Sequence, residues 1–195
     1  MRWIHRLAVA ALLATLAPGV APRAAAADPP PATPKNPISV DAEAAEPWTD
    51  DELRRRCHDE VLALHRFFQG WFNAEIEASE AGQAEFERVL ADDFSYISSS
   101  GHMLPKSVLF QGIWPDNGWW TKDGQPAGRT RVENFDFRRL GESHALVTFE
   151  YWQDHAGESR GRQNTAILER DDSQRHGIRW VRVHETRLPE PSDGD

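Results

Sequence analysis

The amino-acid sequence predicts an α+β domain in which helices come first and an antiparallel sheet follows. Apolar residues recur at spacings of three and four from Leu53 to Ile76, which is the pattern of one buried helix face. After residue 130 the pattern changes, and four stretches alternate between apolar and polar residues, as half-buried strands do. The breaks between these stretches have the length of hairpin turns, so we expect consecutive strands to run antiparallel.

Three helices are expected in the first half of the domain. The longest begins at a capping box, where the Thr49 hydroxyl can accept from an unpaired amide and Glu52 follows three residues later. Its apolar stripe continues to about Ile76. The expected helices therefore cover about residues 49–76, 83–90 and 105–114.

The expected strands begin with a short one at Phe94–Ser98. Ser99–Gly101 can turn the chain there, and Met103-Leu104 can pair back against it. The longer alternating stretches supply the remaining strands of the sheet, which are residues 131–140, 145–153, 160–170 and 178–188.

The first 27 residues have the organisation of a secretory signal peptide. A basic start with Arg2 and Arg6 precedes an apolar run over residues 7–16, and small residues lead to an expected cleavage between Ala27 and Asp28. The apolar run is short for a membrane span, so no stable membrane anchor is expected. We therefore expect a periplasmic or secreted protein.

The remaining sequence divides by composition into three parts. Residues 28–48 are rich in Pro and Ala and predict a disordered linker. Residues 49–188 carry the periodic patterns and form the expected domain. Residues 189–195 predict a disordered acidic tail.

Charge and cysteine content exclude some classes of protein. The chain holds 31 acidic and 22 basic residues, and its net charge of −9 argues against a nucleic-acid partner. Cys57 is the only cysteine, so the fold cannot rely on an internal disulfide. Its spacing from Leu53 and Val61 predicts a buried, inert thiol. His58, His65 and His102 lack metal-ligand spacing, and neither a metal nor another cofactor is expected.

Two local motifs give the chain a resemblance to a known superfamily. Residues 91–98 (ADDFSYIS) are similar to an L-x-x-D-F start of a first strand, and residues 180–185 (WVRVHE) are similar to a W-x-x-x-H closing strand. With the order of elements, residues 50–188 resemble SnoaL-like and ketosteroid-isomerase-like domains of the nuclear transport factor 2-like superfamily. The resemblance implies a cone-shaped, curved antiparallel sheet wrapped around the N-terminal helices. Its members include isomerases, cyclases, dehydratases and binding modules, so the fold alone leaves the function open.

The strand register decides which residues would line a pocket in such a cone. If the hairpins centre near Ala156 and Gln174, Asn164 faces both Thr148 and His184, and Glu150 faces Arg162. This register puts Glu185 on the opposite face. The predicted pocket face comprises Leu146, Thr148, Glu150, Trp152, Arg162, Asn164, Leu168, Trp180, Arg182 and His184.

The candidate catalytic residues on this face are His184, as a proton shuttle near neutral pH, and Glu150, as a carboxylate base. The candidate ligand-binding residues are Trp152, Asn164, Tyr96, His65, Phe68 and Trp180. A structural interpretation stays open beside this one, because Glu150 with Arg162 is also an ordinary cross-strand ion pair.

Three functions remain open from the sequence. The first is binding of a small apolar or aromatic molecule in the cone, without catalysis. The second is an isomerase, dehydratase or cyclase that transfers protons through His184 and Glu150. The third is a non-catalytic interaction module that forms a homodimer. In the first two, the loop that holds Trp119 and Trp120 could close the pocket.

Overall fold

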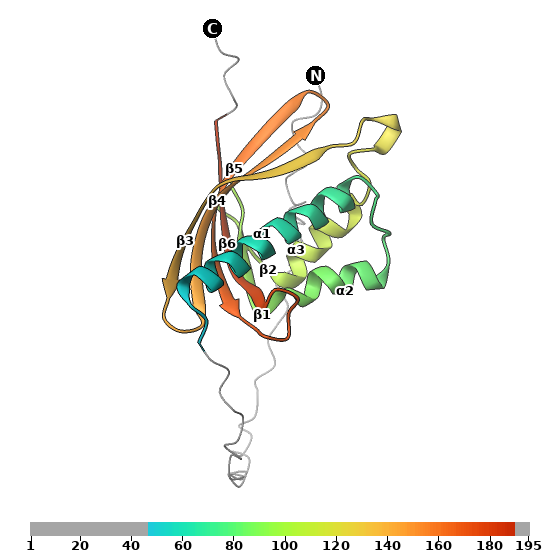
Figure 1. Ribbon diagram of the computed structural model, residues 1–195. Coiled ribbons are helices and arrows are strands. Elements are labelled where there is room, and N and C mark those ends of the chain that lie inside the picture. The colour runs from blue at the N-terminus through green and yellow to red at the C-terminus, as the bar shows by residue number, and fades with distance from the viewer. Residues whose placement is uncertain (1–46, 190–195) are drawn as a thin grey trace, which may run out of the picture. The chain divides into compact units, whose positions relative to one another are not determined.

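The protein is described here from a computed structural model, in which residues 47–189 are placed (Figure 1). The predicted signal peptide, the predicted linker up to residue 46 and the predicted acidic tail from residue 190 lie outside these described residues. Within residues 47–189, no helix combines the length and apolar character needed to cross a bilayer.

Three α-helices form where the apolar periodicity predicts them: α1 (Asp50–Phe72), α2 (Glu80–Arg88) and α3 (Lys106–Ile113). The capping box forms at the start of α1, where the Thr49 hydroxyl oxygen accepts from the Glu52 amide at 3.2 Å. The loop after α3 contains two single-turn 3-10 helices, η1 (Trp114–Asp116) and η2 (Lys122–Gly124).

Helix α1 ends four residues before its predicted end at Ile76. Asn73 caps it, and Ala74 then adopts a left-handed φ of +58° that a continuing helix cannot accommodate. The amides of Glu75 and Ile76 still donate to the Gly70 carbonyl, so the turn after the helix remains hydrogen-bonded.

A six-stranded sheet makes up the second half of the domain, in the order β2-β1-β6-β5-β4-β3. Its strands are β1 (Leu90–Ile97), β2 (Met103–Pro105), β3 (Arg129–Leu140), β4 (His144–His155), β5 (Glu158–Arg170) and β6 (Ile178–Arg187). The predicted antiparallel pairing of the last four strands is confirmed. The sheet as a whole is mixed, because β1 lies parallel to β6.

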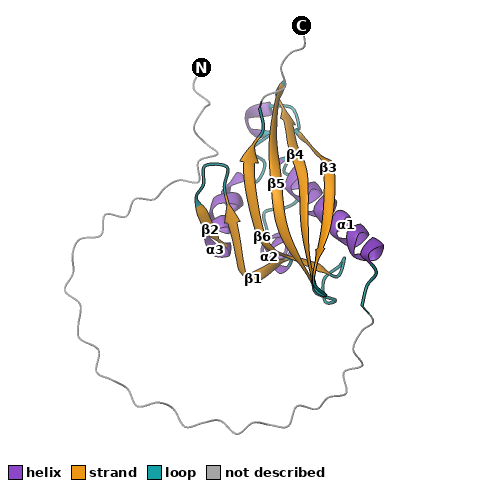
Figure 2. Cartoon of the chain, turned by 90° about the vertical axis from the view of Figure 1, so that its left-hand side faces the viewer, coloured by secondary structure: helices purple, strands orange, loops and turns teal. Residues whose placement is uncertain are grey.

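The helices lie on one side of this sheet, which curves around α1 (Figures 1 and 2). The inner face of the sheet meets α1 with small and apolar side chains from β4, namely Ala145, Val147 and Phe149, each at most 1% exposed. From α1, Leu53, Val61 and Trp71 complete this core and are at most 2% exposed. The architecture is the predicted α+β cone.

The predicted register between β4 and β5 is wrong by one residue. The hairpin turns on two residues, Ala156 and Gly157, which both have positive φ, so its centre lies between them and not at Ala156. Thr148 consequently pairs with Thr165, and Phe149 pairs with Asn164. A shift of one residue exchanges the two faces of a strand relative to its neighbour.

The register between β5 and β6 is right at one end and wrong at the other. Leu168 pairs with Trp180 as predicted, but a bulge at Val181 shifts the rest of the strand. Beyond the bulge, Thr165 pairs with His184 and Asn164 pairs with Glu185. The bulge is the reason that Glu185, and not His184, lies on the inner face.

Candidate functional site

The two predicted catalytic residues lie on the outer face of the sheet, away from the helices. Glu150 pairs with Gln163 across the strands, whereas His184 is exposed and pairs with Thr165. Glu150 accepts hydrogen bonds from Trp152 Nε1 at 2.9 Å and from Asn134 Nδ2 at 2.8 Å. These two bonds lower the pKa of Glu150, Trp152 having the larger effect. The structure therefore does not bring Glu150 and His184 together as a proton-transfer pair.

Trp152 is likewise on the outer face. Its ring covers Gly161 of β5, where a Cβ atom would lie 2.6 Å from the ring, and the Arg131 guanidinium stacks over it at 5.0 Å. This packing leaves Trp152 outside the cone and explains the glycine opposite it.

The inner face instead carries a hydrogen-bonded chain of polar side chains, which we call the inner polar cluster: Tyr96, Tyr151, Gln153, Arg162 and Glu185. Arg162 Nε lies 3.0 Å from Glu185 Oε1, and the two side chains are 14% and 12% exposed. Arg162 Nη1 also donates to Gln153 Oε1 at 3.0 Å, and Gln153 Nε2 donates to the Tyr151 hydroxyl at 3.0 Å. The Tyr96 hydroxyl donates to Glu185. The cluster thus joins β1, β4, β5 and β6.

Burial controls the protonation of this cluster. It raises the pKa of Glu185 above its ordinary range, although the Arg162 charge and the Tyr96 hydrogen bond both oppose that shift. Burial also raises the pKa values of Tyr96 and Tyr151, so both phenols remain hydroxyl donors at physiological pH. The cluster combines a cation, a carboxyl group and two phenols within one hydrogen-bonded chain.

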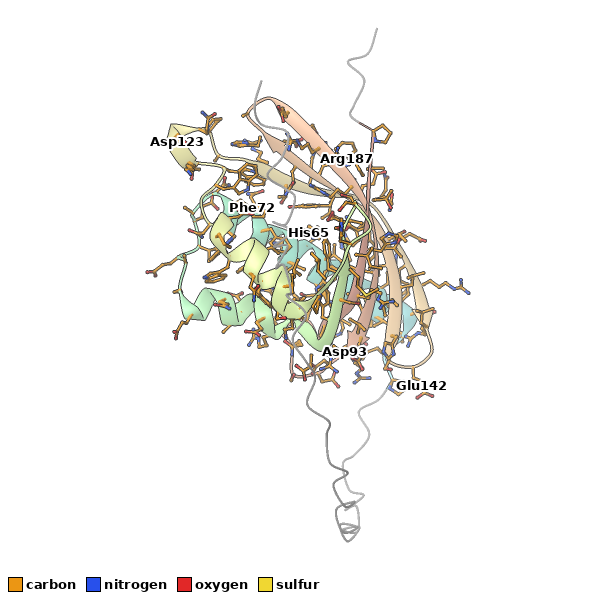
Figure 3. All side chains as sticks on the ribbon, turned by 180° about the vertical axis from the view of Figure 1, so that it is seen from behind. His65, Phe72, Asp93, Asp123, Glu142 and Arg187 are labelled. Carbon is orange, nitrogen blue, oxygen red and sulfur yellow. The ribbon has the colours of Figure 1, made fainter. Side chains whose placement is uncertain are left out.

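His65 lies between the helices and the sheet (Figure 3) and contacts Tyr151 of the cluster. Its Nδ1–H donates to the Val61 carbonyl at 2.7 Å, and its ring is 4.3 Å from that of Tyr151 and 5.2 Å from that of Phe149. Burial lowers the pKa of His65 to about 4, so the ring is neutral at physiological pH. It is an uncharged aromatic ring that is only 6% exposed.

The other predicted ligand-binding residues also lie on the inner side. Phe68 is partly buried beside His65, with ring centroids 6.0 Å apart. Asn164 is 3% exposed and donates to the Arg162 carbonyl at 3.2 Å. Trp180 is 1% exposed and donates to Glu60 Oε1 at 3.2 Å, so its indole is already occupied within the core.

The tryptophans of the loop between α3 and β3 pack into the fold. Trp120 is 1% exposed, lies against Phe72 and His155, and covers Gly128. Trp114 stacks on Trp71 with ring centroids 4.2 Å apart. Trp119 is only partly buried beside them. These contacts give Trp114 and Trp120 structural positions, and Trp114 and Trp119 are the two that remain partly exposed.

Sequence reasoning missed Glu185 and Tyr151 as inner residues and did not single out Glu60. The alternation in β4 carried a usable signal, because Ala145, Val147, Phe149 and Tyr151 form its more apolar face and should point to the core. Glu60 occupies a core position of the α1 stripe, between Cys57 and Leu64 at spacings of three and four.

Two surface hollows lie away from the inner polar cluster. One, of about 310 Å³, involves α1, α2 and the β5–β6 connection, and the other, of about 380 Å³, involves α2, β1 and α3. Among residues 47–189, no three His, Cys, Asp or Glu side chains are arranged to hold a metal ion. Cys57 is buried, and burial raises its pKa to about 12.

Comparison with known proteins supports the fold and goes no further. No family model matches the sequence, and no curated protein matches it. A solved NTF-2 like protein of unknown function from Pseudomonas aeruginosa is similar in structure, with a TM-score of 0.60 and 20% identity over 69% of this chain and 99% of that one. The S. rosetta CaMKII hub has a TM-score of 0.50 and 9% identity over 73% of this chain and 100% of that one. The nuclear transport factor 2-like fold inferred from the sequence is thereby confirmed.

Proposed function

We propose that the protein binds a small organic molecule on the inner side of its cone, with the inner polar cluster holding the polar group of the ligand. The observation that carries this proposal is the Arg162–Glu185 ion pair, whose side chains are 14% and 12% exposed. A pair so far removed from water gains little stability, because desolvation of both charges offsets their attraction. Each side chain nevertheless retains some accessible surface, through which a ligand could make contact.

The neighbouring side chains indicate the chemistry of the ligand. His65 is neutral and aromatic, Phe68 is apolar, and Tyr151 presents both a ring and a hydroxyl. Arg162 and Tyr96 are donors, whereas Glu185 is the acceptor. A small, mainly apolar or aromatic molecule with one hydrogen-bonding group matches this surface.

Native mass spectrometry of the full chain, expressed in its native host, tests the proposal. The wild type is expected to carry a small molecule, and the double variant Arg162→Met/Glu185→Leu is expected to lose it while remaining folded. Arg182→Met is the matched control, because Arg182 is an exposed arginine that contacts Ser95 outside the cone. A ligand-free wild type, or equal retention by all three proteins, would contradict the proposal.

A homodimer is a second candidate function, favoured by the outer face of the sheet. Leu146 and Ile167 are cross-strand neighbours there, and both are partly buried. We expect Ile167→Glu to halve the mass in solution measured by light scattering, since a charge would oppose burial of this face. Thr165→Glu, on the same face, should act in the same direction. A wild-type monomer contradicts this candidate.

We also propose export from the cytoplasm, on the strength of the sequence of residues 1–27. Sequencing the mature protein from fractionated cells should give Asp28 as the first residue, and deleting residues 1–27 should retain the protein in the cytoplasm. Recovery of intact Met1 in the mature protein would contradict the proposal.

A further inference from the structure

The hollow beside α1 is lined by residues that have no part in the proposed function. It measures about 310 Å³ and is lined by Ala63, Arg66, Phe67, Ile76, Glu85, Arg175 and His176. None of these residues belongs to the inner polar cluster. Its volume is at the lower end of the range of small-molecule sites.

The floor of this hollow is apolar. Ala63 and Phe67 of α1 are 7% and 8% exposed, and Ile76 packs partly buried against the same core. An aromatic ring or a short acyl chain placed here would therefore contact carbon atoms on the helix side.

The polar wall of the hollow is basic. Arg175 is 37% exposed, lies 3.3 Å from Glu85 and only 3.9 Å from Glu60. Arg66 is exposed and forms no ion pair within residues 47–189. The pKa of the neighbouring His176 is lowered first by burial and then by the Arg175 charge; Asp59 opposes this shift and Arg66 adds to it. Two arginines thus face one carboxylate, Glu85, in the lining of this hollow, in a chain that is acidic as a whole.

Glu60 lies behind Arg175 and is incompletely satisfied. It is 0% exposed; Oε1 accepts from Trp180 Nε1 at 3.2 Å, while Oε2 has no hydrogen-bond partner among the described residues. The Arg175 Nε atom nearest to Oε2 is too distant for a hydrogen bond. A buried carboxyl oxygen without a hydrogen-bond partner is uncommon. Glu60 therefore makes only a long ion pair with the Arg175 guanidinium and no hydrogen bond to it.

We propose that this hollow is a second binding site, specific for a small amphipathic anion. Arg175 and Arg66 bind the carboxylate, sulfonate or phosphate group, and Phe67 and Ile76 contact the apolar body of the ligand. Guanidinium groups suit such anions because they offer several donors in one plane.

Glu60 sets the strength of this site by competing with the anion for Arg175. Among residues 47–189, the titratable or charged groups that interact with Glu60 are Cys57 on α1, Arg88 on α2 and Arg175 on the β5–β6 connection. Burial raises the pKa of Glu60 to about 7, although Trp180, Arg175 and Arg88 each oppose the shift. Below that pH, Glu60 is neutral and Arg175 keeps only its exposed pair with Glu85, so binding of the anion should strengthen as the pH falls.

The experiment uses the fluorescent anion 8-anilinonaphthalene-1-sulfonate with the folded full chain. Single-site binding is expected, with displacement by octanoate and not by octylamine. Arg175→Gln should weaken binding about tenfold, as expected for loss of a charged hydrogen bond. Arg66→Gln, at an exposed position that should not disturb folding, should weaken it several-fold. Arg182→Gln, on the outer face, is the control and should bind as the wild type does.

A third variant tests the role of Glu60. Glu60→Gln should bind the dye more tightly than the wild type at about pH 8 and equally well at about pH 5, since it removes the competing charge. Unchanged binding by both Arg175→Gln and Arg66→Gln would overturn the proposal. So would loss of binding in Arg162→Met/Glu185→Leu with retention in Arg175→Gln, which would place the dye in the cone.

Discussion

Replacing Arg162 with methionine is expected to lower the free energy of unfolding by about 3 to 5 kcal/mol, because it leaves the Glu185 carboxylate buried without its cation. Glu185 is 12% exposed and would retain only its hydrogen bond from Tyr96. Urea unfolding followed by circular dichroism near pH 8 measures the change. The loss should shrink at lower pH, where the carboxyl group with its raised pKa takes up a proton.

The double variant Arg162→Met/Glu185→Leu shows why Arg162→Met is unstable. Either the variant leaves the Glu185 carboxylate buried without a partner, or the ion pair itself stabilises the fold. Replacing both charges with apolar groups should restore stability to within about 1 kcal/mol of the wild type. Arg55→Gln is the matched control, since the Arg55–Asp59 pair has side chains that are 63% and 39% exposed. Its effect should stay below about 1 kcal/mol. A double variant as unstable as Arg162→Met alone would show that the ion pair itself contributes net stability.

The order of elements was predictable because each follows from a local pattern. The stripe from Leu53 onward predicted α1, although its end was placed four residues too late. The alternation after residue 130 predicted β3 to β6, with ends that differ from the structure by at most two residues. The parallel contact of β1 with β6 joins segments about ninety residues apart, and no local pattern specifies such a contact.

The faces of the sheet were not predictable to the same degree, because they depend on turn geometry. A two-residue turn at Ala156-Gly157 and a single bulge at Val181 moved Glu150 and His184 outward and Glu185 inward. Arg162 and Asn164 were assigned to the inner face correctly, since β5 kept its predicted phase relative to Leu168 and Trp180. The candidate site therefore keeps Arg162 from the sequence prediction, but the carboxylate that pairs with it is Glu185 and not Glu150.

The second large effect expected concerns Glu60 and the pH dependence of stability. The pKa of Glu60 is raised from its ordinary value of 4.5 to about 7, mainly by burial. Between these two values the folded protein binds more protons than the unfolded chain, so the wild type should lose stability as the pH rises through this window. The loss should be on the order of 3 kcal/mol and complete above about pH 7.

The variant Glu60→Gln removes this titration and keeps an acceptor for Trp180 Nε1. The difference in unfolding free energy between variant and wild type should therefore shift in favour of the variant by on the order of 3 kcal/mol between about pH 4.5 and pH 8. Any constant offset, such as the poor contact of the amide with Arg175, cancels in this comparison.

Other titrating groups are common to both proteins and cancel in the same way. His65, whose pKa is lowered to about 4, makes the folded protein less stable as the pH falls, which is the opposite slope. Glu85→Gln is the matched control, because Glu85 contacts the same Arg175 from a side chain that is 50% exposed. The difference in unfolding free energy between Glu85→Gln and the wild type should stay nearly constant with pH. If the Glu60→Gln difference is also flat, the pKa of Glu60 is the same in the folded and unfolded protein, so Glu60 is ionised at neutral pH. The Glu60 carboxylate would then offset the charge of Arg175 at neutral pH, and anion binding in the hollow would not depend on pH through Glu60.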